Sequence, residues 1–260
     1  LELSEEIAQG LFRHYALDLP LPVQYIKYLK GFLTFDLGPS LTYENLSVAK
    51  IIKAGLPVSA LIGSEALFLA LVLGFFFGSW SAFFKNRRPF LEKSLSLFSL
   101  FGLCLPNFLL AAGLQYFFAV KLNLLPLSGF ESFAHTLLPA FSLALAPAAF
   151  IAKLLKTGLV EIFASDYIKL ARCKGLGSWQ IFWRHALKNA LLPVIAYLGP
   201  LTAYILTGSF VIEKSFSLPG LGSWLIMSIS NRDYPVILGL SVFFTPFFFL
   251  WSFCRIWPQP

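Results

Sequence analysis

Long apolar runs alternate with short polar segments along most of this 260-residue chain. A helix that crosses the ~30 Å hydrocarbon layer of a bilayer needs roughly 20 mostly apolar residues. Backbone groups in lipid must form hydrogen bonds within their own segment, which favours helices. The pattern predicts five transmembrane helices, at residues 56–84, 95–120, 136–155, 190–212 and 235–257.

The composition supports this class. Hydrophobic residues make up 57% of the chain and charged residues only 13%, whereas soluble domains average about 25% charged residues. The short alternating segments of an outer-membrane barrel are absent from the sequence. We therefore expect an all-α, polytopic membrane protein.

The sequence offers little for chemistry. The three cysteines and three histidines show no metal-ligand spacing, and no phosphate-binding GxxxxGK[ST] motif occurs. We expect no catalytic residues, no cofactor and no metal. Hydrolysis of a nucleotide is expected to take place in another subunit.

Basic residues predict the orientation of the helices. They gather in residues 85–93 and 153–188, whereas residues 121–135 hold only Lys121 and residues 213–233 only Lys214 and Arg232. Because cytoplasmic loops carry the excess of Lys and Arg, the two basic segments should face the cytoplasm. The net charge of +7 is then mainly a topology signal. No nucleic-acid partner is expected, because the basic residues are divided between loops.

This orientation places residues 1–53 outside the cell membrane. The segment has mixed charge and contains neither a span nor a signal peptide, and the chain begins with Leu1. We expect an external N-terminal region at 1–53 and a transmembrane domain at 54–260. An external region without an export signal also indicates that an earlier helix is missing from this numbering.

Residues 166–193 form a charged island between two apolar runs. Ser165 or Asp166 can begin a short helix, Gly175 and Gly177 should end it, and Ser178 can begin a second one. Small residues at Ala171 and Gly175 would let a partner approach, with cations around them. On the residues alone, a docking knob and an ordinary positive-inside loop stay equally open.

The island resembles a known cytoplasmic loop. Asp166-Tyr167, Ala171-Arg172, Lys174-Gly175-Leu176 and the run from Arg184 to Pro193 are similar to that loop in dipeptide/oligopeptide-type permease subunits of ATP-binding-cassette importers. The general signature of importers begins Glu-Ala-Ala, where this chain has Lys169-Leu170-Ala171. Its glycine is kept as Gly175, and the proline comes later than usual, a variant that the peptide-type subunits share.

The resemblance covers nearly the whole chain, which lacks the first transmembrane helix of that family. It includes residues 19–25, 35–40, 105–108, 138–140, 210–213, 216–222 and 231–235. It implies the type I importer permease fold in a bacterial inner membrane. It also implies a second homologous permease subunit, two cytoplasmic ATPase subunits and an external solute-binding protein, with half of a peptide pathway in this chain. The ATPase-coupling loop would be residues 157–189, and its implied contact residues are Asp166, Tyr167, Ala171, Arg172, Lys174, Gly175, Gly177, Arg184 and His185.

Charged residues in the loop between the last two spans are candidates for docking the binding protein: Glu213, Arg232 and Asp233. Tyr204, Thr207 and Ser209 are candidates for the pathway wall. The spacing of Gly74 and Gly78 favours close helix packing, either within the subunit or against its partner.

Three alternatives stay open at this stage. The same architecture could import nickel or another small solute. A protein of a different class, an ion-coupled secondary carrier, would need mid-membrane charged or unwound sites and often shows inverted repeats. A non-transporting membrane scaffold would use the same loop only for docking.

Overall fold

The computed structural model describes residues 18–43, 46–85 and 88–256, so residues 1–17 of the expected external region lie outside it. The described residues are mostly helical, and the β-structure among them is one isolated bridge between Pro39 and Ser47. The elements are α2 (Leu21–Leu33), α3 (Val48–Phe84), α4 (Pro89–Cys104), α5 (Asn107–Leu114), the π-helical η1 (Gln115–Lys121), α6 (Ala134–Ala164), α7 (Asp166–Cys173), α8 (Ser178–Gln180), the π-helical η2 (Ile181–Ala186), α9 (Leu187–Ala190), α10 (Leu192–Ser215), α11 (Leu221–Asn231) and α12 (Tyr234–Ile256).

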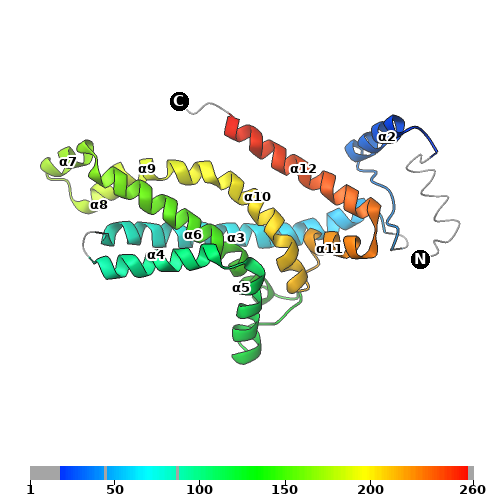
Figure 1. Ribbon diagram of the computed structural model, residues 1–260, viewed down its shortest axis with the longest axis horizontal. Helices are drawn as coiled ribbons and strands as arrows, with labels where there is room; N and C mark the ends of the chain where they lie inside the picture. Colours follow the sequence, from blue (N-terminus) through cyan, green and yellow to red (C-terminus); the bar gives the residue numbers. More distant parts are fainter. Residues whose placement is uncertain (1–17, 44–45, 86–87, 257–260) are drawn as a thin grey trace.

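The long helices form an elongated bundle (Figure 1). The elements α7, α8 and α9 lie at one end, while α2 and α11 lie at the other. The five expected spans fall mainly on helices, with interruptions at residues 105–106 and at Leu191, and residue 257 lies outside the described part of the chain. Within that part, α3 and α6 are each long and apolar enough to cross a membrane. Two pairs of consecutive helical segments, each bent at a short break, raise this number to four if each pair is counted as one span. These pairs are Pro89–Cys104 with Asn107–Lys121, and Ser178–Ala190 with Leu192–Ile205. The apolar segment Tyr234–Thr245 is shorter than these candidate spans.

The second expected span is not one continuous helix. Its helix α4 ends at Cys104 and α5 begins at Asn107, and the two parts of the span are bent by 106°. Leu105 between them is extended, with φ −79° and ψ 124°. Pro106 contributes to this break, because it lacks a backbone N–H and disfavours a helical conformation at the residue before it. As a result, α5 projects from the side of the bundle (Figure 1).

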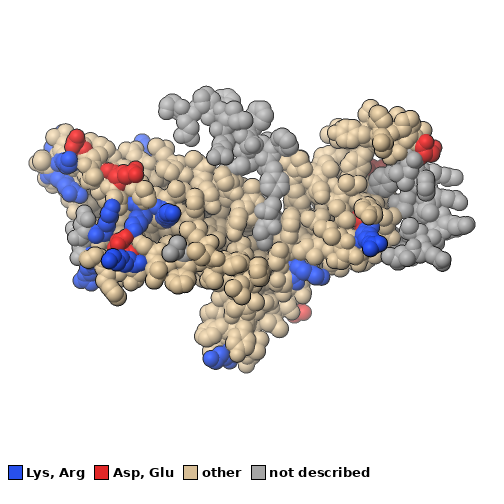
Figure 2. All heavy atoms as spheres, viewed as in Figure 1, with Lys and Arg blue, Asp and Glu red and all other residues tan. Residues whose placement is uncertain are grey.

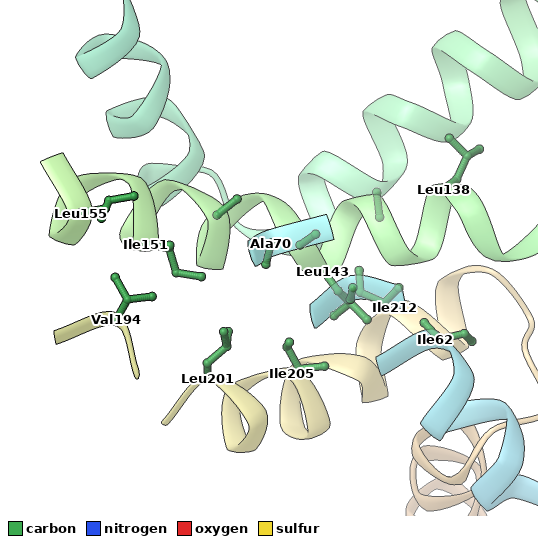
Figure 3. Packing of buried hydrophobic residues seen from close by; sticks show 14 of the residues in the cluster. Ile62, Ala70, Leu138, Leu143, Ile151, Leu155, Val194, Leu201, Ile205 and Ile212 are labelled. Carbon is green, nitrogen blue, oxygen red and sulfur yellow. The ribbon is translucent and has the colours of Figure 1, made fainter. Parts of the chain in front are cut away.

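The main core lies between α3, α6 and α10, whose apolar side chains point toward one another (Figure 3). On α3 the buried stripe repeats every four residues and becomes smaller along the helix, from Ile62 through Ala66 and Ala70 to Gly74 and Gly78. Residues four apart lie on one face of a helix. Their small size lets the backbone of α6 approach closely.

The two glycines lie where α6 comes closest. A Cβ atom on Gly74 would lie 2.6 Å from Cγ2 of Ile151, and one on Gly78 would lie 2.8 Å from the carbonyl oxygen of Ala152. The predicted close packing at Gly74 and Gly78 is thus found inside this subunit, between α3 and α6.

Candidate coupling loop and external loop

The loop between α6 and α10 is a compact knob with its own small core. Ile168, Ala171 and Ile181 are buried against one another, and Leu176 packs onto them. The chain turns at Gly175, whose φ is +80°. There the N–H of Leu176 donates to the carbonyl of Ala171 at 3.3 Å, and the N–H of Gly175 donates to that of Arg172 at 3.0 Å.

This hydrogen-bond pair is a Schellman motif, which ends a helix with glycine in the left-handed conformation and an apolar contact just beyond it. The predicted helix break at Gly175 is therefore present. The predicted side-chain caps are not, because the Ser165 hydroxyl donates instead to the carbonyl of Ile162 and α8 begins without a side-chain cap at Ser178.

One part of the predicted partner surface is wrong. Ala171 is only 7% exposed and faces the interior of the knob, so another protein cannot approach the backbone there. The sequence does not reveal this burial, because alanine on a short helix fits a buried face as well as an exposed one. Gly175, in contrast, is exposed, and a Cβ atom built on it meets nothing within 4 Å.

The other predicted loop residues lie mainly at the surface. Asp166 forms an exposed ion pair with Lys169 at 2.8 Å, and the hydroxyl of Tyr167 accepts a 3.2 Å hydrogen bond from the side-chain amide of Asn189. His185 is half-buried, and the exposed members are Arg172, Lys174, Gly177 and Arg184. Basic side chains gather at this end of the bundle (Figure 2).

A second ion pair supports the same end of the molecule. Lys156 on α6 donates to the carboxylate of Glu92 on α4 and also to the Ser96 hydroxyl, at 2.7 Å. Both charged side chains are about four-fifths buried. This contact fastens α4 to α6 next to the knob.

At the opposite end, Glu213 is fully buried. Its Oε2 accepts hydrogen bonds from the backbone N–H groups of Gly222, at 2.8 Å, and Ser223, at 3.2 Å. These N–H groups belong to the first turn of α11, where a carboxylate complements the helix dipole. Glu213 therefore fixes α11 onto the end of α10.

The glycines of the Leu-Pro-Gly-Leu-Gly turn follow from this packing. A Cβ atom on Gly220 would collide with the Glu213 carboxylate, and one on Gly222 would lie 2.5 Å from Cα of Phe210. The hydroxyl of Ser59 on α3 also reaches this turn, where it accepts a 2.9 Å hydrogen bond from the N–H of Leu221.

Asp233 is also fully buried. Its carboxylate accepts hydrogen bonds from the Ser40 hydroxyl and from the N–H of Leu41, the latter at 3.2 Å. Nearby, the amide of Asn231 donates to the hydroxyl of Tyr43 at 3.3 Å. Asp233 thus fastens the segment before α3 to the corner between α11 and α12.

These contacts change the expectation that the charged residues at 213–233 are available to dock a binding protein. Of the three predicted docking residues, only Arg232 is exposed, and it ends α11 with φ +57°. Glu213 and Asp233 offer no charge to a binding protein at the surface of this chain, because their carboxylates bond to its own backbone and to the Ser40 hydroxyl. The partner Ser40 lies 193 residues from Asp233, so no local pattern reveals the pair.

A polar pair, which the sequence pattern did not reveal, lies where the second span breaks. The amide of Asn107, the first residue of α5, donates a 2.9 Å hydrogen bond to the hydroxyl of Tyr204 on α10. Tyr204 is 38% exposed, whereas Ser209 is buried, and the side chain of Thr207 lies outside the described part of the structure. The proline at the break is the one sequence signal for this pair.

Comparison with known proteins shows which family of sequences this chain resembles. A family model for the "binding-protein-dependent transport system inner membrane component" matches residues 74–257. The dipeptide transport system permease protein DppB of Bacillus subtilis is 44% identical over 242 residues, which are 93% of this chain and 78% of that protein. The oligopeptide transport system permease protein OppB of Salmonella typhimurium is 37% identical over 92% of this chain and 78% of its own length.

A solved structure shares the fold. It is described as the crystal structure of an amino acid ABC transporter with histidines, and it matches 88% of this chain and 97% of its own with a TM-score of 0.59. The sequence identity is 14%, so the likeness concerns the arrangement of the helices.

Proposed function

Because this chain belongs to the family of binding-protein-dependent transport system inner membrane components, we propose that it is the permease subunit of an ATP-driven peptide importer. The observation that carries the substrate class is its 44% identity, over 93% of its length, to a dipeptide transport system permease. In this proposal the chain is a multi-pass inner-membrane protein that forms half of the pathway. A homologous permease forms the other half, two separate ATPase subunits hydrolyse ATP, and an external binding protein delivers the peptide.

The knob of α7, α8, η2 and α9 is the proposed contact with an ATPase subunit. A lever must be stiff to transmit movement, and the Schellman turn and the buried cluster around Ile168 give this loop a fixed shape. Lys174 and Arg184 are exposed on it for charge-assisted contacts. Arg172 belongs to the same loop but lines a cleft toward α3.

The test of this function is uptake by the complete complex. The chain is reconstituted in proteoliposomes with its second permease and ATPase subunits, and labelled dipeptide is added with the binding protein. We expect peptide accumulation that requires ATP. Uptake of nickel or an amino acid in place of peptides would correct the substrate, and accumulation driven by an ion gradient without ATP would assign the chain to the secondary carriers.

The left-handed turn at Gly175 gives a prediction about coupling. Replacing Gly175 by valine forces a β-branched residue into a conformation that costs roughly 1–2 kcal/mol, which lowers the ratio of native to non-native turn by a factor of about 5–30. We expect ATP-driven uptake to fall by up to this factor while the chain still inserts into the membrane. The measurement is uptake per ATP hydrolysed.

Gly177 provides the matched control for this variant. It is also exposed with open space around its Cα, but its φ is −67°, which any residue adopts. Gly177 is also one of the implied contact residues, so Gly177→Val places the same side chain on that surface without backbone strain, and it should transport better than Gly175→Val. Equal transport by the two variants would remove the turn at Gly175 from the coupling mechanism.

The polar pair Asn107–Tyr204 marks the proposed pathway wall. Tyr204 lies about 18 Å along α10 from Leu192, at 1.5 Å per residue, and therefore within the ~30 Å hydrocarbon layer. Irregular backbone and polar groups at this depth are tolerated only inside protein or beside water. Because Tyr204 and the break at Leu105 are partly exposed in this subunit, they fit a wall facing a water-filled path. An amide side chain also matches the donor and acceptor groups of a peptide backbone.

Cys104 allows a direct test, because it is exposed at the end of α4 next to the break. With Cys173 and Cys254 replaced by serine, a charged thiol reagent should modify Cys104, and a transported peptide should slow the reaction. The control is Phe68→Cys with Cys104 also replaced by serine, since Phe68 is 66% exposed on α3 and should face lipid. If Cys104 reacts no faster than this control, the break does not face water.

A further inference from the structure

An aromatic groove lies between the end of α3 and the second half of the knob. It has a volume of about 570 Å³, and eight of its ten lining residues are aromatic. Trp80 and Phe83 come from α3, while Trp179 and Trp183 come from the segment formed by α8 and η2. These four side chains are 43–72% exposed. Nothing in the fold described above uses this surface.

A basic cleft adjoins the groove and shares Phe83 and Ser178 with it. Its volume is about 590 Å³, and its cations are Lys85 at the end of α3 and Arg172 on α7. The remaining lining comes mainly from apolar residues of α3, α6 and η2, and no acidic residue lines the cleft within the described part of the chain. One continuous surface therefore has an apolar half and a cationic half.

The position of this surface relative to the membrane decides what fits it. The groove lies on the last apolar turns of α3, while Lys85 and Arg172 belong to the basic segments that face the cytoplasm. Tryptophan is enriched at this depth, where its ring is partly in lipid and its N–H is near water. The apolar half thus borders the acyl chains and the cationic half borders the headgroups of the cytoplasmic leaflet.

We propose that this surface binds one anionic glycerophospholipid of the cytoplasmic leaflet. An acyl chain lies in the groove between Trp80 and Trp183, and the phosphate lies in the cleft beside Lys85 and Arg172. Basic pockets between membrane helices on the cytoplasmic side are suited to anionic headgroups, and 570 Å³ is within the usual range of roughly 300–1,000 Å³ for small-molecule sites.

Such a lipid would touch both a transmembrane helix and the knob. It would fill the gap between α3 and η2, so that a movement of the knob changes the lipid site. The influence of lipid charge on transport follows from this contact and rests on the proposed function. Binding of the lipid does not depend on which solute is transported.

The test is native mass spectrometry of the purified complex, titrated with phosphatidylglycerol or with phosphatidylcholine. We expect one tightly retained phosphatidylglycerol for each copy of this chain, and weaker retention of phosphatidylcholine. Each cation near an anionic headgroup contributes about fivefold to binding, so Lys85→Gln combined with Arg172→Gln should weaken retention by roughly 25-fold.

Two further variants keep the result interpretable. Lys93→Gln combined with Lys153→Gln removes the same charge from exposed cytoplasmic residues that line neither half of the surface, and it should retain the lipid. Ser79→Trp should block the groove without removing a cation. Equal retention of the two lipids, or equal loss in both double variants, would overturn the proposal.

The ATPase is the competing occupant of this surface. If phosphatidylglycerol is retained only after the ATPase subunits are removed, the surface is part of the ATPase contact and the proposal is wrong. Failure of peptide uptake would leave all of these binding results unchanged, so the two proposals can fail separately.

Discussion

Replacing Gly78 by isoleucine is expected to separate α3 from α6 and to leave little folded protein. A Cβ atom at this position would lie 2.8 Å from the Ala152 carbonyl oxygen and 3.0 Å from Cβ of Leu155. Backbone atoms cannot move aside as a flexible side chain can, so the helices must shift. Overpacking of a tight core costs about 1–3 kcal/mol, and we expect the upper end of this range or more. The measurement is the thermal unfolding temperature in detergent, followed by size-exclusion chromatography.

Gly113 supplies the control for this prediction. It also lies inside a helix, α5, but a Cβ atom on it would meet nothing within 4 Å. Gly113→Ile changes the intrinsic helix propensity in the same way without creating an overlap, and it should unfold near the temperature of the unmodified chain. If both variants unfold at the same temperature, the stripe on α3 does not set the distance between the helices.

Replacing Asp233 by alanine is expected to release the segment before α3. The substitution removes the acceptor of the Ser40 hydroxyl and of the Leu41 N–H. A buried donor that loses its partner costs about 1–3 kcal/mol. Hydrogen exchange at the Leu41 amide should become at least tenfold faster, while the amides of the α3–α6 core keep their protection.

Asp36→Asn is the matched control, because Asp36 is an exposed carboxylate on the same segment. It should leave the exchange of Leu41 unchanged. An Asp233→Ala chain in which Leu41 stays protected would show that the apolar contacts of Leu37 and Val48, which are buried in the same cluster as Val236 and Leu240, hold the segment without the carboxylate.

Local signals in the sequence predicted local structure well. The apolar runs located the long helices, and Gly175 marked the turn of the knob because few residues other than glycine adopt a φ of +80° easily. The glycine pair of α3 predicted close packing. A proline near the middle of the second span was a visible signal for its break, yet prolines such as Pro147 lie inside intact helices. Proline alone therefore does not decide between a kink and a break.

Contacts between distant segments could not be predicted. Glu213 and Asp233 bound the predicted loop between the last two spans, where charges are ordinarily solvated. Their burial depends on donors supplied by α11 and by the segment at Ser40. Ala171 is a similar case, since only the folded knob shows which side of α7 faces inward. The polar pair of Asn107 and Tyr204 joins residues 97 positions apart. A single sequence does not show which distant residues are in contact. It therefore predicts the helices but not the faces through which they pack.

The length of α3 makes bilayer thickness a variable for this protein. Its apolar stretch at residues 56–84 is roughly 43 Å long at 1.5 Å per residue, well beyond a hydrocarbon layer of ~30 Å. A helix with this mismatch tilts or thickens the lipid around it. Because the glycine stripe holds α6 against α3, the two helices must incline together. A thinner membrane should therefore favour a larger tilt of both helices away from the membrane normal, and a thicker membrane a smaller tilt.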